Sequence, residues 1–238
     1  MRKFPAIAFS LTLGWGQTTG LTPERVMTLA KQLFRDSAEL PMDVTVTTVV
    51  TNAAGKEKHR ATSTVLFVFK GYNQEAGHFS FNGHSGWFNT WALRDSLTGH
   101  FAAYIAGTRL APKKGEPQNI EIRETRLVLS HDENCAPFEL LPRFLYPKRT
   151  CASAEFRLGD DGTFEHFTLN VTNLPAQAKV VYLGDVRITG FHVEEDFQQS
   201  FLPGDPKPFL LPKRVETTVT TDRGKIVISN VYAPKARH

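Results

Sequence analysis

The chain has 238 residues, of which 41% are hydrophobic and 22% are charged. This length fits one domain or at most two small ones, and the balance of apolar and charged residues excludes a disordered tail, a coiled coil and a collagen-like fibre. The formal net charge of +4 gathers into no basic face along the sequence, so we expect no nucleic-acid partner.

The start of the chain has the plan of a secretory signal peptide. Arg2 and Lys3 form a basic head, an apolar run follows over 4–13, and small residues lead to a predicted cleavage site after Gly16. The run is shorter than the roughly 20 apolar residues that span a bilayer as a helix. An uncleaved N-terminal anchor is the alternative. We predict that 1–16 is a signal peptide and that the mature protein is soluble and periplasmic or secreted.

One amphipathic helix is expected at the start of the mature chain. Thr22 is a suitable N-cap and Pro23 suits the first helical position. Pro41 is expected to end the helix. The apolar residues between them fall at the spacing of a single helical face: Val26, Leu29, Ala30, Leu33 and Phe34. An apolar stripe needs a surface to cover it, so we expect the helix to pack on the sheet that follows.

From Met42 onward, apolar and polar residues alternate with period two, and turn residues interrupt the pattern. Tight turns are expected at 160–162 and 222–224. The fold class predicted is mainly β, with a strongly curved antiparallel sheet of about ten or eleven strands forming a barrel or half-barrel, in a single domain over 21–238. The pattern marks twelve candidate segments for these strands, at residues 43–51, 61–69, 77–82, 86–93, 100–106, 120–130, 153–158, 164–172, 178–184, 186–201, 214–221 and 225–232.

The strand expected at 186–201 has one apolar and one polar face, whereas 65–69 is apolar throughout and should be covered on both faces. The chain holds 18 Phe against 5 Tyr and 3 Trp, so most of its aromatic surface needs no hydrogen bond. Such surface suits either a well-packed core or an apolar cavity lined by rings. For a cavity, the predicted ligand-binding residues are Phe67, Phe69, Phe191, Phe197 and Phe201.

The two cysteines, Cys135 and Cys151, are expected to form a disulfide in an exported protein. In the chain-entropy model, closing this loop contributes roughly 3 kcal/mol. The enclosed segment is rich in apolar residues, so we expect either a flap over the mouth of the sheet or a short helix on an open end. A second long loop is expected at 202–213. A metal site built on the two cysteines is the weaker alternative, because only His131 and Asp132 lie close in sequence as further ligands.

Motifs that name a reaction are absent from the sequence. There is no phosphate-binding glycine pattern, and the stretch 83–86 places its second glycine one position too early for a nucleophile elbow. His192 and Glu194 should share one side of a strand, but a zinc site needs three converging ligands. We therefore expect no catalytic residue, no metal and no cofactor.

Segments at both ends of the chain carry a family resemblance: LTPERV at 21–26, LPKRVE at 211–216, DRGKI at 222–226 and SNVY at 229–232. With the single leading helix and the continuous antiparallel pattern, they resemble the LolA/LolB-like periplasmic lipoprotein carriers and the outer-membrane lipoprotein-sorting proteins. The resemblance implies a strongly bent sheet, helical elements plugging its concave side, and an apolar cavity for acyl chains. It transfers no site residue to this chain.

Together these observations predict an exported, non-enzymatic carrier or binding protein for a lipid or a lipoprotein acyl chain, with the segment 135–151 as a gating flap. The expected ligand is a lipid or an acylated protein. We expect a monomer that makes transient contact with a membrane or with envelope proteins. Two alternatives stay open: a secreted structural or interaction β-module with a filled core, and a secreted hydrolase whose site is assembled from loops.

Overall fold

The computed structural model describes residues 22–33, 40–69, 120–123, 126–130, 151–202 and 204–234. Within these residues the chain forms one helix and nine strands. The elements are α1 (Pro23–Leu33), β1 (Leu40–Asn52), β2 (Glu57–Phe69), β3 (Ile120–Arg123), β4 (Arg126–Ser130), β5 (Cys151–Leu158), β6 (Phe164–Val180), β7 (Gly184–Phe201), β8 (Pro208–Thr221) and β9 (Gly224–Pro234). Several predictions fall outside the described residues, namely the signal peptide, the strands expected at 77–82, 86–93 and 100–106, and the flap with Cys135.

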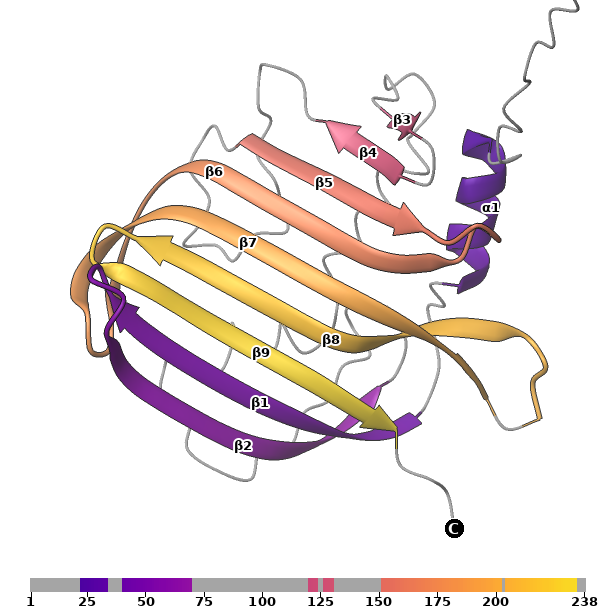
Figure 1. Ribbon diagram of the computed structural model, residues 1–238. Coiled ribbons are helices and arrows are strands. Elements are labelled where there is room, and N and C mark those ends of the chain that lie inside the picture. Colours follow the sequence, from indigo (N-terminus) through magenta and orange to yellow (C-terminus); the bar gives the residue numbers. More distant parts are fainter. Residues whose placement is uncertain are drawn as a thin grey trace, which may run out of the picture.

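The strands form one antiparallel sheet in the order β2-β1-β9-β8-β7-β6-β5-β4-β3. The sheet is curved: in the view of Figure 1, β6 and β7 bow upwards and β1 and β2 bow downwards. Within the described residues β2 and β3 form its two edges and do not pair with each other, so this sheet is open. The mainly β, antiparallel character is confirmed, and the described strands number nine where about ten or eleven were expected.

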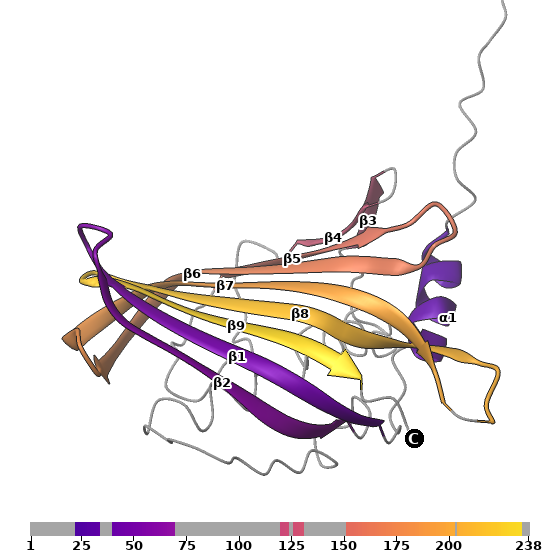
Figure 2. The same cartoon turned by 60° about the horizontal axis from the view of Figure 1, so that its bottom comes forward.

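Helix α1 begins as its sequence predicts. The hydroxyl of Thr22 accepts a hydrogen bond from the backbone N–H of Arg25 at 3.3 Å, which satisfies one of the orphan donors of the first turn. The buried residues of the helix, Val26, Ala30 and Leu33, share one face. The helix contacts β8 and lies at the end of the sheet where β8 begins (Figures 1 and 2).

The strand boundaries differ from the prediction at three places. β6 continues through a register irregularity between Thr172 and Ala176, so the segments expected as two strands at 164–172 and 178–184 are largely one. The strand expected at 120–130 is the hairpin of β3 and β4. The loop expected over 202–213 is shorter, because β8 already begins at Pro208.

Two prolines of β8 occupy positions that a strand tolerates. Pro208 is its first residue, and Pro212 lies opposite Phe197, next to a register shift in the pairing with β7. Proline lacks an N–H group, and it is accepted at a strand start or a bulge because no ladder hydrogen bond is lost there.

Both predicted tight turns are present. At 160–162, the Asp161 carboxylate accepts hydrogen bonds from the backbone N–H and the hydroxyl of Thr163 at 2.8 and 2.7 Å, and these bonds lower the pKa of Asp161. At the turn that joins β8 to β9, a Cβ on Gly224 would collide with the backbone carbonyl of Thr51. Only glycine fits where β9 approaches the end of β1 so closely.

One face of the sheet forms the core of the described structure. Opposite residues on paired strands share a face, so the register defines rows of side chains that run across the sheet. One such row is entirely buried and consists of Val46, Asn230, Val215, Glu195, Phe167 and Phe156, from β1 to β5. We call the side of the sheet that carries this row the apolar face and the other side the polar face.

Candidate functional site

The apolar face carries a cluster of polar side chains on three adjacent strands, β7, β8 and β9. We call it the central cluster; its members are Glu195, Thr217, Asn230 and Tyr232. Glu195 and Asn230 have none of their surface exposed, and Thr217 and Tyr232 each have only 4%. Both Glu195 and Asn230 lie opposite Val215, on its two sides. Polar groups so deeply buried normally have hydrogen-bond partners, so each member of the cluster calls for a physical explanation.

Glu195 is the most unusual member of the cluster. Its neighbours across the pairing are Phe167 on β6 and Val215 on β8, both with 0% exposure. Both carboxyl oxygens are buried, and neither has a hydrogen-bond partner among the described residues. Loss of hydration raises the pKa of Glu195 well above 4.5, and the charge of the adjacent Asp196 raises it further. Burial therefore favours the neutral acid, which carries one O–H donor.

Tyr232 and Asn230 form a pair beside Glu195. The side chain of Asn230 donates a hydrogen bond to the Tyr232 hydroxyl. Burial raises the pKa of Tyr232 well above 10.0, and the Glu195 carboxyl raises it further. The phenol and the carboxyl group are therefore close enough to act on each other electrostatically, and the phenol stays protonated. Thr217 adds a second buried hydroxyl, whose oxygen has no partner among the described residues.

The central cluster therefore consists of uncharged groups in apolar surroundings. A carboxylic acid, an alcohol and a phenol can each donate a hydrogen bond to an acceptor atom of a ligand. The cluster contains no imidazole and no thiol, and burial holds its carboxyl group and its phenol in their protonated forms. No group of three or more potential metal ligands occurs among the described residues. What the groups of the cluster offer is hydrogen-bond donation in apolar surroundings.

The polar face presents a different arrangement around His166. Its Nδ1 lies 2.7 Å from Oδ1 of Asp196, and its Nε2 lies 3.2 Å from the hydroxyl oxygen of Thr168. The order carboxylate, imidazole, hydroxyl is that of a hydrolase triad. However, β6 is paired on both sides, so its backbone N–H groups serve the sheet and cannot form an oxyanion hole. The Asp196 side chain is also 42% exposed, which suits a surface pair.

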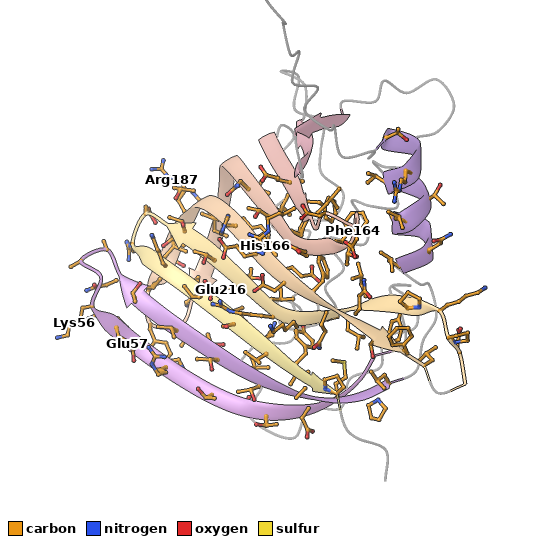
Figure 3. All side chains as sticks on the ribbon, turned by 45° about the vertical axis from the view of Figure 1, so that its right-hand side comes forward. Lys56, Glu57, Phe164, His166, Arg187 and Glu216 are labelled. Carbon is orange, nitrogen blue, oxygen red and sulfur yellow. The ribbon has the colours of Figure 1, made fainter. Side chains whose placement is uncertain are left out.

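His192 and Glu194 lie on the same side of β7, as the alternation predicts. His192 bonds Asn170 through Nδ1 at 2.6 Å and Glu194 through Nε2 at 3.1 Å. On the neighbouring strand β8, Arg214 pairs with Glu216 at 2.6 Å. His166 and Glu216, both labelled in Figure 3, belong to this polar face. Each of these charged groups thus has a partner on the same or the adjacent strand.

The predicted ligand-binding residues do not form one buried set, because some are buried on the apolar face and one is exposed. Phe191 and Phe197 are buried, with 5% and 8% exposure, on the apolar face with Glu195. Phe201, at the end of β7, is 57% exposed. Phe67 and Phe69 pair with Met42 and Leu40 in the register of β1 and β2, and their side chains lie outside the described part of the structure. For the predicted disulfide, Cys151 begins β5 and Cys135 lies outside the described residues.

Sequence reasoning missed Glu195, although a signal for it exists. Phe191, Val193 and Phe197 mark the buried positions of β7, and Glu195 occupies the same parity between Val193 and Phe197. A strict alternation count therefore places a carboxyl group on the apolar face. The same count places Asn230 between Ile228 and Tyr232 on β9.

Comparison with known proteins adds no relative. No protein-family model matches the chain, and neither the curated proteins nor the solved structures contain a significant match. No helix in the described ranges is both long and apolar enough to cross a membrane.

Proposed function

We propose that this protein is an exported, non-enzymatic carrier or binding protein for a lipid or an acyl chain, which it holds against the apolar face of a half-barrel sheet. The observation that supports this proposal is the continuity of that face. From β5 to β1 it presents buried Ala, Val, Leu, Ile, Met and Phe side chains, interrupted by the central cluster and by the two threonines Thr48 and Thr221. The resemblance to LolA/LolB-like carriers points to the same class of ligand.

The energetics of acyl-chain transport require such a surface. Each methylene group removed from water contributes about 0.8 kcal/mol, so a chain of a dozen or more methylenes gains on the order of 10 kcal/mol from an apolar host. No catalytic group is needed for this task. A curved sheet supplies a wide apolar surface from few residues, because every second side chain of each strand points to the same side.

The remaining parts of the proposal follow from the sequence. The predicted signal peptide sends the protein to the periplasm or out of the cell, where an acyl chain must cross water. The segment 135–151 acts as a flap, held by a disulfide between Cys135 and Cys151. The carrier works as a monomer that meets a membrane or envelope proteins only transiently.

The test is native mass spectrometry of the full protein, purified from its own cell envelope without detergent and followed by organic extraction and lipid analysis. We expect a stoichiometric adduct whose mass corresponds to a lipid or an acyl chain. A clean apo mass, together with no uptake of cis-parinaric acid in a fluorescence titration, would contradict the proposal and favour an interaction module with a filled core.

A matched pair of variants localises the binding surface. Val193, on the apolar face, has 0% exposure, and Val231, on the polar face, is 50% exposed. Val193→Thr and Val231→Thr make the same isosteric change on opposite faces. We expect Val193→Thr to weaken the binding of cis-parinaric acid and Val231→Thr to leave it unchanged. Equal effects of the two variants would contradict binding on the apolar face.

A further inference from the structure

We propose that Glu195 anchors the carbonyl oxygen of a bound acyl group by donating a hydrogen bond to it, with the hydroxyl group of Thr217 as a neighbouring donor. This inference rests on the proposed function and specifies the ligand chemistry of the same site. The ligand class is an acyl compound whose carbonyl group lies within the apolar face, either an ester or a free fatty acid.

The position of Glu195 supports an anchoring role. It lies on β7, in the interior of the sheet. The strands β6 and β5 follow on one side, and β8, β9 and β1 follow on the other. Its carboxyl group is fully buried and has no partner among the described residues, and the same holds for the hydroxyl oxygen of Thr217 on the adjacent strand. An unpaired buried polar group is unfavourable, and a ligand acceptor atom would remove that penalty.

The chemistry of the cluster favours an acceptor over a cation. Binding an ammonium group would require an ionised carboxylate between Phe167 and Val215, where no hydration stabilises a charge. The raised pKa of Glu195 agrees with a neutral acid at this position. Thr217, on the adjacent strand, also carries an O–H group that has no partner among the described residues, so the cluster offers a further donor beside Glu195. A carbonyl oxygen has two lone pairs and suits this set.

The decisive experiment is a fluorescence titration of the full protein with cis-parinaric acid and with its methyl ester. Two substitutions at Glu195 separate the roles of its carboxyl group. Glu195→Gln keeps a hydrogen-bond donor and cannot ionise, whereas Glu195→Leu removes all hydrogen bonding at similar size. Glu194→Leu is the matched control, because Glu194 is the preceding residue and lies on the polar face.

We expect Glu195→Leu to weaken binding of the methyl ester about tenfold, which is the effect of one lost hydrogen bond. Glu195→Gln should stay within about threefold of the wild-type affinity, and Glu194→Leu should match the wild type. Binding of both probes supports carbonyl recognition with an ester as a sufficient source. Binding of the acid alone supports a free fatty acid as the source.

Three results would overturn the anchor. If Glu195→Leu binds the methyl ester as tightly as the wild type does, Glu195 makes no contact with the ligand. If Glu195→Gln loses as much affinity as Glu195→Leu, the ionised carboxylate is needed for binding, as it would be for a cationic ligand. An unshifted infrared carbonyl stretch of bound carbonyl-¹³C-labelled methyl palmitate shows that the carbonyl receives no hydrogen bond. If the wild type binds neither probe, the proposed function itself fails instead.

Discussion

Three consecutive acidic residues of β7 lie in opposite surroundings on the two faces of the sheet. Glu194 and Asp196 lie on the polar face, and each bonds a histidine, at 3.1 and 2.7 Å. Glu195, between them, is fully buried, and its carboxyl oxygens have no partner in the described part of the chain. On the polar face these two carboxylates thus have partners close by, whereas the apolar face keeps a hydrogen-bonding group that the described fold does not use. This difference locates the candidate site.

The two faces also differ in how much they stabilise the fold. Phe156 and Phe167 have 0% exposure, and their ring centroids lie 4.8 Å apart. A buried aromatic side chain contributes several kcal/mol through burial and close packing. Exposed ion pairs such as Arg214 with Glu216 contribute about 0–1 kcal/mol. The stability of the sheet therefore comes mainly from the apolar face.

The largest effect is expected from truncation of the apolar face. Phe156→Ala should lower the free energy of unfolding by about 3–5 kcal/mol, because it leaves a cavity beside Phe164 and Phe167. The neighbouring Arg157→Ala, on the polar face, should lower it by about 1 kcal/mol or less. Urea denaturation followed by circular dichroism measures both. Similar losses for the two variants would contradict the assignment of the faces.

The next effect has the opposite sign. Glu195→Leu should raise the free energy of unfolding of the ligand-free protein by about 1–3 kcal/mol, because it replaces an unpaired buried carboxyl group with an apolar side chain of similar size. Glu194→Leu serves as the control and should give no gain. Denaturation of delipidated protein measures the difference. A loss of stability in Glu195→Leu would show that the carboxyl group has a partner in the folded state.

The pH dependence of stability should reflect the same residue. In the unfolded chain Glu195 has its ordinary pKa of 4.5, and in the folded state its pKa is well above this value. Between these pKa values the folded protein holds a proton that the unfolded chain has released. The free energy of unfolding should therefore fall as the pH rises above about 4.5, by up to about 1.4 kcal/mol per pH unit.

Glu195→Gln isolates this contribution, because it leaves all other titrating groups in place. The difference in unfolding free energy between the wild type and Glu195→Gln should be constant below about pH 4.5 and should decline above it. Urea denaturation over a series of buffers gives this difference. A difference that does not change with pH would show that the folded state leaves the pKa of Glu195 at its ordinary value.

Much of the sheet was predictable from local sequence. The alternation of Val and Thr in β1 and the Asp–Gly turn at 160–162 predict their hairpins because short-range chemistry determines them. The breaks were harder to interpret. Pro175 and Pro212 look like strand ends in the sequence, yet the pairing of β6 with β7 and of β7 with β8 continues past them through register shifts. Tertiary pairing overrides the local preference there.

The candidate site was predictable only in part. The parity of Glu195 can be counted along β7, so its face follows from the sequence. Its lack of a partner depends on which residues the register places opposite, here Phe167 and Val215, and this register is set by long-range pairing. The contact between His166 and Asp196 depends in the same way on the pairing of β6 with β7. The residue pattern of one strand does not show which residues the neighbouring strand places opposite it, so it predicts neither the missing partner of Glu195 nor the contact of His166.

The smallest expected effect tests whether the two faces act on each other. Asp196→Asn removes a partner of His166 at the surface and should lower the free energy of unfolding by about 1 kcal/mol or less. At about pH 5, Asp196→Asn should lower the free energy of unfolding by a similar amount in the wild type and in Glu195→Gln. Glu195 is neutral at this pH, so it carries no charge for Asp196 to repel.

At higher pH the two backgrounds should diverge. The charge of Asp196 raises the pKa of Glu195, so Asp196→Asn lets that pKa fall toward its ordinary value. The folded state then loses less stability as the pH rises, which offsets part of the loss of the His166 contact. In Glu195→Gln no such compensation is available. A double-mutant cycle at two pH values measures this coupling. The same loss in both backgrounds at every pH would show that the strand separates the faces electrostatically, and the raised pKa of Glu195 would then be due to burial alone.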